Sequence, residues 1–483
     1  MSRLSLLAAC LILPTTIIAA QSAPANPLAP YISVSAPVVA LTHVEVIDGT
    51  GSAPAFDQTI VLNYGKIASV GSSATAQIPS GAKILDLAGH AVYPGLVGMH
   101  EHLFYTEPGR HEYTPLFGEM VDSAPRLYLA AGVTSGRTTG SMEPYTDLNI
   151  KKAIDAGKMP GPDLDITGPY LEGQGSFAIQ MHGLTGPADA TKLVNYWAGE
   201  GVTSFKAYMQ ITPEELKAAI DTAHSHGLKI TGHLCSIGFR EAADMGIDNL
   251  EHGLLVDTEF YSGKKPDVCP GGGMSEREMA NSLDIAGPQV ENTIRDLVKH
   301  HVAVTSTLSV FEMSAPNRPT MAFLTRERDS MMPQAWTSVL DIRAQIAEHA
   351  DKSIWLVLLK KEMQFEREFV AAGGLLMAGC DPTGYGAVLP GFGDERNLEL
   401  LVEAGFTPEQ AIQIYTENGA KYLGREDRIG TIAAGKQADL VVVTGDPAID
   451  ISAVEHVDTV FKKGIGYDPQ KLIDSIRGMV GIR

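Results

Sequence analysis

The feature that most constrains the fold is the alternation of amphipathic helical segments with short aliphatic segments through the middle of the chain. A helical pattern such as "TPEELKAAIDTAHSHG" is followed at once by a strand-like run, "LKITGHL", and this arrangement recurs from about residue 120 to residue 381. Such repetition is typical of βαβ units, whose strands pair in parallel. About eight strands over about 300 residues favour a closed (β/α)₈ TIM barrel. An open doubly wound sheet is disfavoured because no Gly-rich phosphate-binding fingerprint follows the first strand.

Both ends of the chain have β patterning instead. Residues 38–93 contain short β-rich runs such as "FDQTIVLNYGKIASVG", separated by Gly, Asp-Gly and Pro, and residues 426–483 return to this pattern in "QADLVVVTGDP". We therefore predict one small β domain built from both chain ends, with the barrel, residues 94–425, inserted between them.

One connection within the predicted barrel is unusually long. Residues 312–352, between the seventh and eighth strands, are rich in Met, Arg and Pro. We expect an enlarged helical excursion over the mouth of the barrel, where it could act as a lid.

The first 24 residues are typical of a secretory signal peptide. Arg3 precedes an apolar stretch that ends in small residues, so we expect export to a periplasm or beyond. The chain has 57 acidic and 37 basic residues, a formal net charge of −20. This balance argues against nucleic-acid binding and, once the signal is removed, against binding to an anionic membrane. A small molecule is the expected partner.

Cysteine usage predicts no disulfide framework. Removal of the signal leaves Cys235, Cys269 and Cys380, an odd number, so at least one thiol stays free. We interpret Cys235 and Cys380 as small apolar fillers of the core.

The ends of the predicted strands carry side chains that could bind metal ions. In a barrel of this class, the loops at the carboxyl ends of the strands build the site. Alternate residues of a strand face the same way, so two histidines separated by one residue can share one ion. Imidazoles and carboxylates are the usual ligands of zinc-like ions. The candidates are His100 and His102 after the first strand, His233 after the fifth, His252 after the sixth and Asp381 after the eighth, and a sixth polar residue, Lys206, stands at the end of the fourth strand.

These motifs resemble those of the amidohydrolase superfamily, and the likeness extends from about residue 38 to residue 465. "PGLVGMHEHLF" is similar to the superfamily's His-x-His strand, and "NLEHG" and "GCDPTG" are similar to its sixth- and eighth-strand motifs. The segment that begins "GFTPEQAIQIYTENGAKYLG" resembles imidazolonepropionase-like and prolidase-like members. The resemblance implies a distorted (β/α)₈ barrel with a flanking β-sandwich.

The resemblance also implies roles for the six residues. His100, His102 and Asp381 would bind the more buried of two divalent metal ions, expected to be zinc, and His233 and His252 the more exposed one. Lys206 would be carboxylated and bridge both ions, although one-metal members lack this bridge and Lys206 could instead form an ion pair. Asp381 would act as the catalytic base and then as the acid.

Three further residues are candidates for substrate binding. Tyr208 resembles a residue that related peptidases place near the substrate, although it could also pack at the barrel rim. His182, with Gln180 beside it, follows the third strand but departs from the Gly-His-Gly pattern of imidazolonepropionase. Arg137, after the second strand, could pair with a substrate carboxylate or form a helix-side ion pair.

Together these features predict an exported, binuclear metal hydrolase that cleaves an amide or peptide bond. The expected substrate is dipeptide-like or an N-acyl amino acid, including aromatic amides of the ochratoxin type. The alternatives are a lactone, ester or cyclic-amide hydrolase on the same metal site, and a non-catalytic assembly protein. The prolidase-like relatives imply a homo-oligomer, with an octamer as one form.

Overall fold

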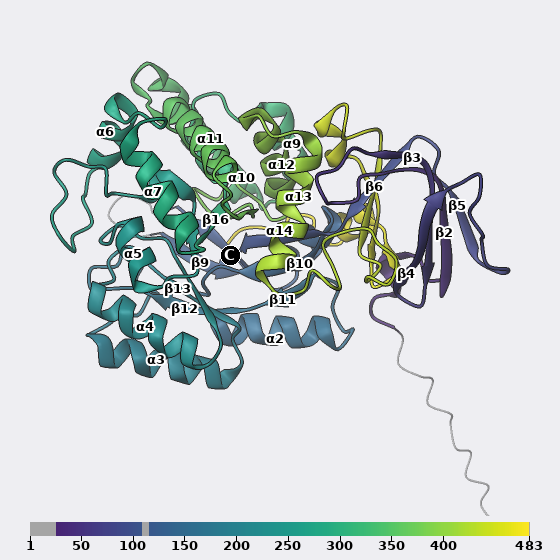
Figure 1. Ribbon diagram of the computed structural model, residues 1–483, viewed down its shortest axis with the longest axis horizontal. Coiled ribbons are helices and arrows are strands. Elements are labelled where there is room, and N and C mark those ends of the chain that lie inside the picture. The colour runs from purple at the N-terminus through teal and green to yellow at the C-terminus, as the bar shows by residue number, and fades with distance from the viewer. Residues whose placement is uncertain (1–25, 109–114, 483) are drawn as a thin grey trace, which may run out of the picture.

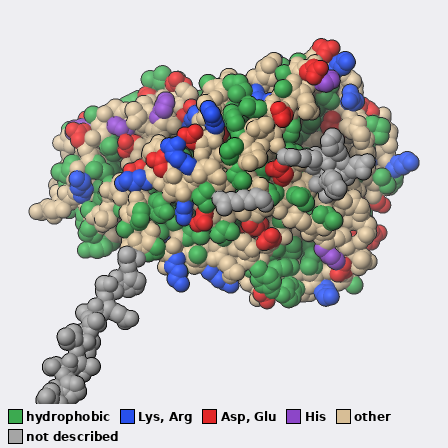
Figure 2. All heavy atoms as spheres, turned by 180° about the vertical axis from the view of Figure 1, so that it is seen from behind, with side chains coloured by type: hydrophobic (Ala, Val, Ile, Leu, Met, Phe, Trp, Pro, Cys, Tyr) green, Lys and Arg blue, Asp and Glu red, His purple; other side chains and the backbone are tan. Residues whose placement is uncertain are grey.

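The computed structural model describes residues 26–108 and 115–482, and shows an α/β part joined to a β part (Figure 1). The predicted signal peptide lies outside the described residues. Within them, no helix combines the length and the apolarity that crossing a membrane requires. On the face seen in Figure 2, acidic and basic side chains are interspersed with hydrophobic ones.

The α/β part contains two parallel sheets. The strand order is β11-β10-β7 in the first sheet and β12-β13-β14-β15-β16-β17 in the second. Only Ile166 separates β11 from β12, so these two strands follow one another as the third strand along the chain. The strands are β7 (Leu96–Glu101), β10 (Val133–Thr138), β11 (Asp163–Asp165), β12 (Thr167–Leu171), β13 (Ser204–Ala207), β14 (Lys229–Gly232), β15 (Asn249–Glu251), β16 (Ala303–Ser306) and β17 (Leu376–Ala378).

Backbone hydrogen bonds join the two sheets at both edges. The N–H of Asp381, after β17, donates to His100 O on β7 at 2.9 Å, and the N–H of Ser141, after β10, donates to Gly168 O on β12 at 3.1 Å. These contacts are of the kind that a barrel requires. The α/β class is confirmed, and the closed, distorted (β/α)₈ barrel stays a prediction.

Helices surround the strands in Figure 1. Several begin with strong local signals: α4 starts with Pro213 after a capping box in which Thr212 and Glu215 each accept the other's backbone N–H. The helices are α1 (Ser123–Ala130), α2 (Pro144–Asp155), α3 (Pro187–Glu200), α4 (Pro213–Ser225), α5 (Phe239–Met245), α6 (Met274–Ser282), α7 (Pro288–Lys299), α8 (Leu308–Glu312), α9 (Met321–Glu327), α10 (Pro333–Glu348), α11 (Trp355–Ala371), α12 (Phe392–Ala404), α13 (Pro408–Tyr415), α14 (Glu417–Tyr422) and α15 (Pro469–Asp474).

Strand alternation separates the apolar core from a polar interior. Phe205 and Leu250 are fully buried in the main hydrophobic core, whereas the next residues, Lys206 and Glu251, carry charged groups that are buried on the other side. Lys206 pairs in register with Thr231 on β14, and Glu251 with Thr305 on β16. The parallel sheets therefore present a layer of polar side chains at their carboxyl ends.

The β part is one nine-stranded sheet that uses both ends of the chain, which is why purple and yellow segments lie side by side in Figure 1. Antiparallel pairing of β6 with β18 joins residues about 350 positions apart, since Val92 is opposite Val442. A sandwich arrangement of this sheet stays a prediction. The strands are β1 (Ile32–Val34), β2 (Val38–Val46), β3 (Ala55–Asn63), β4 (Lys66–Ser72), β5 (Lys83–Asp86), β6 (His90–Pro94), β18 (Leu440–Thr444), β19 (Val457–Lys462) and β20 (Ile465–Tyr467).

The excursion at residues 312–352 is helical and includes α9 and α10. It is held to the C-terminal segment: Met332 N–H donates to Val480 O at 2.8 Å, and Val480 N–H donates to Ser330 O at 2.9 Å. Its function as a lid stays a prediction.

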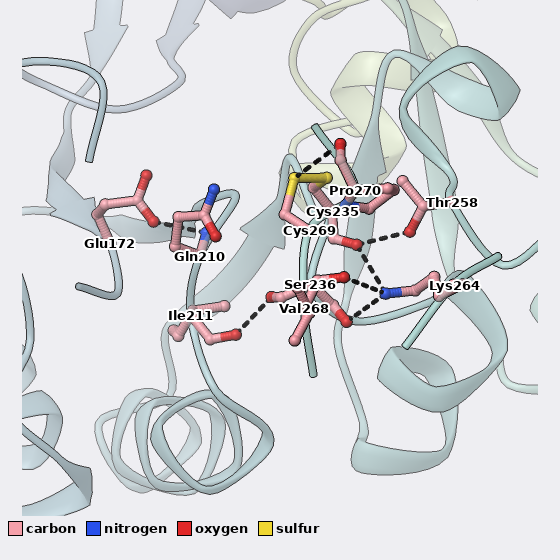
Figure 3. The surroundings of a disulfide bond; sticks show 10 residues. All are labelled: Glu172, Gln210, Ile211, Cys235, Ser236, Thr258, Lys264, Val268, Cys269 and Pro270. Atoms are coloured by element: carbon pink, nitrogen blue, oxygen red, sulfur yellow. Dashed lines mark hydrogen bonds between the residues drawn. A yellow bond between two sulfur atoms is a disulfide. The ribbon is translucent and has the colours of Figure 1, made fainter. Parts of the chain in front are cut away.

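Contrary to the predictions of no disulfide framework and of Cys235 as an apolar filler, Cys235 and Cys269 are bonded, with 4.8 Å between their Cα atoms (Figure 3). The two cysteines lie in the segments that follow β14 and β15, which the parallel sheet brings together. Thr258 Oγ1 and Lys264 Nζ also donate to Cys235 O, at 2.6 and 3.1 Å. Cys380 is a free, buried thiol, as predicted.

Candidate metal centre

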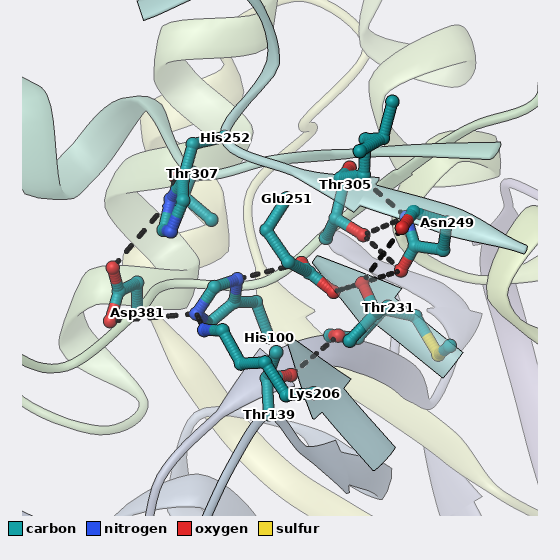
Figure 4. Close-up of polar contacts among 12 residues, drawn as sticks. His100, Thr139, Lys206, Thr231, Asn249, Glu251, His252, Thr305, Thr307 and Asp381 are labelled. Atoms are coloured by element: carbon teal, nitrogen blue, oxygen red, sulfur yellow. Dashed lines mark hydrogen bonds and ion pairs between the residues drawn. The ribbon is translucent and has the colours of Figure 1, made fainter. Parts of the chain in front are cut away.

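The six residues predicted as metal ligands converge at the carboxyl ends of the parallel strands, and Figure 4 shows His100, Lys206, His252 and Asp381 close together. Asp381 Oδ1 lies 3.4 Å from His102 Nε2 and 3.7 Å from His100 Nε2, and its Oδ2 lies 3.7 Å from His252 Nδ1. The His233 ring centroid is 4.5 Å from that of His252. Side chains at the end of β7 and after β7, β14, β15 and β17 therefore share one location.

Two of these residues reach the site through unusual backbone conformations. His252 has φ +68° and Asp381 has φ +47°, in the left-handed region that residues with a side chain seldom adopt. Because the left-handed turn breaks the strand's alternation, the side chains of both Glu251 and His252 lie on the interior side. Such conformations persist where the surrounding structure holds them, and they concentrate at functional sites.

Three of the imidazoles are oriented by hydrogen bonds at Nδ1. His100 Nδ1 lies 2.8 Å from Glu251 Oε2, His102 Nδ1 lies 3.2 Å from Gly140 O, and His252 Nδ1 lies 2.8 Å from Thr307 Oγ1. A histidine that binds a metal usually engages its other ring nitrogen in this way. The Nε2 atoms of His100 and His102 are thus directed to the Asp381 carboxylate and to the centre.

The electrostatics of the site favour neutral imidazoles beside an ionised carboxylate. Burial lowers the pKa of His102 to about 4, and it lowers the pKa of His100, His233 and His252 as well. Burial alone would raise the pKa of Asp381, but the neighbouring imidazoles, His100 foremost, hold it well below its usual value. Neutral imidazoles and carboxylates are the protonation states that a divalent cation requires of its ligands.

Lys206 is a fully buried amine in the same location. Its Nζ lies 3.3 Å from His100 Nε2, and over the rings of Tyr170 and Tyr208 at 5.5 and 5.6 Å from their centroids. Burial lowers its pKa to about 8. A substantial fraction of the amine is therefore neutral in mildly alkaline solution, and only the neutral amine can react with carbon dioxide.

The donor set fits a divalent metal ion. One ligand atom from each of His100, His252 and Asp381 lies within 4.8 Å of the others, and all three residues are buried. Of these three residues, His252 was predicted to bind the more exposed ion, and His100 and Asp381 were predicted to bind the more buried one. Asp381 is therefore within reach of both sets, and the division of ligands between two ions stays a prediction.

A cavity of about 270 Å³ opens onto the centre. Eight aromatic and imidazole rings form a closed circuit with neighbouring centroids 4.5 to 6.4 Å apart, and all of them except His100 line this cavity. Half of the circuit consists of imidazoles and half of hydrocarbon or phenol rings. The order is His102, Phe104, Phe117, Phe177, Tyr208, His233, His252 and His100, with Phe311 in contact with His252.

The predicted substrate contacts differ in where they lie. Tyr208 lines the cavity between Phe177 and His233. His182 is about half exposed, pairs with Asp189 at 2.9 Å and does not line this cavity. Arg137 does not line it either, because its guanidinium is buried behind His100, where it contacts Glu251 Oε1 at 2.7 Å. The structure therefore replaces the predicted substrate contact of Arg137 with an internal ion pair.

Gln180 also has a role that the sequence did not indicate. Its Oε1 accepts from Phe117 N–H at 2.8 Å and its Nε2 donates to Phe117 O at 2.9 Å. Phe117 belongs to β9 (Leu116–Glu119), which pairs with β8 (Phe104–Glu107). Gln180 therefore connects the loop that carries Phe177 to this β8–β9 pair, which carries the other two phenylalanines of the ring circuit.

Residues 332–465 match the model of the amidohydrolase family. The superfamily resemblance predicted from the motifs is thus confirmed. Of the six candidate ligands, only Asp381 falls inside the matched residues, so the other five rest on position and geometry.

The similarity to individual relatives extends over nearly the whole chain. The chain is 20% identical over 443 residues to an imidazolonepropionase of Fusobacterium nucleatum, an alignment that covers 88% of this chain and 93% of the relative. A solved Xaa-Pro dipeptidase is 20% identical, with TM-score 0.65, covering 89% of this chain and all of that one. The ochratoxinase of A. niger is 18% identical, with TM-score 0.63, covering 92% of this chain and all of that one. At these identities the two solved structures show a shared fold.

Proposed function

We propose that the protein is a metal-dependent amidohydrolase. It cleaves the amide bond of a dipeptide-like or N-acyl amino-acid substrate whose acyl part is aromatic or otherwise bulky and apolar. The observation that carries this proposal is the division of the cavity wall into an imidazole half and an aromatic half. A substrate that spans both halves places its carbonyl beside Asp381 and its apolar group against Phe104, Phe117 and Phe177.

Divalent metal ions, when bound by the six residues, would polarise the substrate carbonyl and lower the pKa of a water molecule. Asp381 is ionised at neutral pH, so its carboxylate can take the proton of the attacking water. The same carboxyl group then delivers that proton to the departing amine nitrogen, which leaves Asp381 ionised again. Asp381 therefore serves as base in the first half of the reaction and as acid in the second.

Lys206 and Tyr208 act beside this carboxylate. The neutral amine of Lys206 can add carbon dioxide and release one proton to solvent, which gives a carbamate anion that could help to hold divalent metal ions. Burial raises the pKa of Tyr208, so its hydroxyl stays protonated and can donate to a substrate carbonyl. The Lys206 amine lies in the imidazole half of the cavity. The Tyr208 hydroxyl group belongs to the ring at the boundary between the imidazole half and the aromatic half.

The names of the structural relatives support this class of substrate. One solved relative is called a Xaa-Pro dipeptidase and another an ochratoxinase, names that refer to a dipeptide and to ochratoxin. We extend the proposal to two zinc ions, export to the periplasm or beyond, and a homo-oligomer such as an octamer.

A cyclic-amide hydrolase is a second candidate, because the relative that aligns over 443 residues is an imidazolonepropionase. The aromatic half of the cavity favours the first candidate. A lactone or ester would use the same centre, so a direct comparison of substrates is required.

The experiment measures metal content per chain in protein purified without chelator, together with hydrolysis of N-acyl amino acids, dipeptides, lactones and cyclic amides. We expect about two equivalents of metal and fastest turnover of aromatic N-acyl amino acids, lost on chelation and restored by zinc. One equivalent with activity that is insensitive to Lys206→Ala would exclude the bridged pair. Preference for cyclic amides would favour the second candidate, and a protein without metal or turnover would overturn both.

A further inference from the structure

Behind the metal centre, a chain of buried charges ends on His100, and Figure 4 shows its last contact, between Glu251 and His100. Glu251 Oε2 lies 2.8 Å from His100 Nδ1, and Glu251 Oε1 accepts from Arg137 Nη2 at 2.7 Å. All three side chains are at most 2% exposed. Thr231 Oγ1 also donates to Glu251 Oε1. Each oxygen of this carboxylate therefore has a fixed direction.

Arg137 also contacts the backbone next to His100. Its Nε and Nη2 donate to Met99 O at 3.0 and 2.5 Å, and its guanidinium lies 5.5 Å from the centroid of the Tyr422 ring. Met99 immediately precedes His100 on β7. One guanidinium thus fixes both the peptide that leads into His100 and the carboxylate that contacts its ring.

We propose that Arg137 and Glu251 form a brace that sets the tautomer and the ring orientation of His100, and that Glu251 is thereby a positioning residue for metal binding. This inference rests on the proposed metal centre. Glu251 bound to Arg137 is an acceptor, so the proton of the neutral imidazole lies on Nδ1. The lone pair then lies on Nε2, the atom directed to Asp381 and Lys206.

Loss of the brace should weaken metal binding even where the fold survives. Without the carboxylate, the imidazole can carry its proton on Nε2, which cannot then be a ligand, or rotate about its side-chain bonds. Outer partners of this kind change metal affinity by about 10–100-fold in metalloproteins. Removal of one charge alone would also leave its partner buried and uncompensated, an effect on stability that must be separated from positioning.

The test separates these two effects by removing either one charge or both. Glu251→Gln leaves Arg137 uncompensated, whereas the double variant Arg137→Met with Glu251→Gln leaves no net charge. Zinc affinity is measured on each apoprotein by competition with a chromophoric chelator, and stability by thermal unfolding without metal. We expect both variants to bind zinc about 10–100-fold more weakly than the unmodified protein, and the double variant to recover much of the lost stability.

A control uses a partly buried ion pair of another region. Arg326 Nη2 lies 2.5 Å from Glu395 Oε2, and both residues line a different cavity. The double variant Arg326→Met with Glu395→Gln should alter stability and leave zinc affinity within about twofold. If the Arg137 and Glu251 double variant recovers normal zinc affinity along with stability, Glu251 only balances charge and the proposal is overturned.

Failure of the brace and failure of the proposed function give different results. An unmodified protein that binds no zinc would overturn the proposed function, and the brace with it. Normal zinc binding in the unmodified protein and in both variants would overturn the brace alone. If neither variant folds, nitrogen-15 NMR of the zinc-loaded unmodified protein decides, since a proton on His100 Nδ1 supports the brace and a proton on Nε2 contradicts it.

Discussion

The two halves of the cavity wall are built in different ways. The imidazole half stands on strand ends, and His100, His102 and His252 are each at most 2% exposed. Apart from Tyr208, which follows β13, the aromatic half stands on the β8–β9 pair and the loop after β12, where Phe177 is 39% exposed. Rigid strand ends suit ligands whose geometry must be fixed, and loops suit contacts that select among substrates. We therefore expect changes in the first half to affect rate and changes in the second to affect selectivity.

The largest effect should come from the carboxylate at the centre of the imidazole half. Asp381→Asn removes the group proposed to accept and return the proton, so kcat should fall by about 10²–10⁴-fold with smaller changes in KM. Steady-state kinetics on an aromatic N-acyl amino acid and metal content of the same preparation are the measurements. Asp189→Asn is the matched control, because Asp189 pairs with His182 outside the cavity. A metal-loaded Asp381→Asn variant with normal kcat would contradict the assignment.

The second effect concerns the stability of the metal-free protein in acid. His102 has a folded pKa of about 4, below the 6.5 of a free imidazole, so the unfolded chain takes up the proton first. Stability should therefore fall as pH falls through the window from 6.5 to about 4, by about 1.4 kcal/mol per pH unit for this histidine.

Thermal unfolding of the apoprotein between pH 7 and pH 4 measures this slope. His102→Gln should make the slope shallower by about one proton, whereas Phe117→Leu in the aromatic half should lower stability equally at every pH. A slope unchanged in His102→Gln would show that this imidazole is not held neutral.

The same contrast explains what the sequence could and could not predict. The ligands at His100, His233 and Asp381 were predictable because each directly ends or follows an aliphatic run, and parallel strands bring their ends together. The period of two that places Asn249 in the interior also places Glu251 there, so its position beside His100 left a signal in "NLEHG". The left-handed backbone at His252 places the side chains of Glu251 and His252 on the same side, and nothing in the sequence indicated this conformation.

The loop-built features depended on contacts between distant segments. Phe117 and Phe177 are 60 residues apart and meet in space, and Cys235 and Cys269 lie in different loops. Nothing in the spacing of either pair specifies a contact. The strand that carries Arg137 was predicted correctly, but its partner is Glu251 and not a substrate carboxylate. The position of a residue on a strand does not determine whether a long side chain points to the mouth of the barrel or into the layer below the mouth.

The smallest effect should come from Gln180, which holds the aromatic half together without lining the cavity. Gln180→Ala removes two hydrogen bonds to the Phe117 backbone, each worth about 0.5–1.5 kcal/mol. Because the bonds are exposed, we expect a rise in KM of at most about tenfold for substrates with an aromatic acyl group, kcat within about twofold, and no change for an acetyl substrate.

Gln180→Glu is the matched variant for this prediction, because its carboxylate can still accept from Phe117 N–H but cannot donate to Phe117 O. Its effect should lie between those of the unmodified protein and of Gln180→Ala, measured as the ratio of kcat/KM for the aromatic and acetyl substrates. Equal changes for both substrates would mean that the loop supports the whole cavity. A change in that ratio with kcat preserved would show that the aromatic half selects the substrate while the imidazole half performs the chemistry.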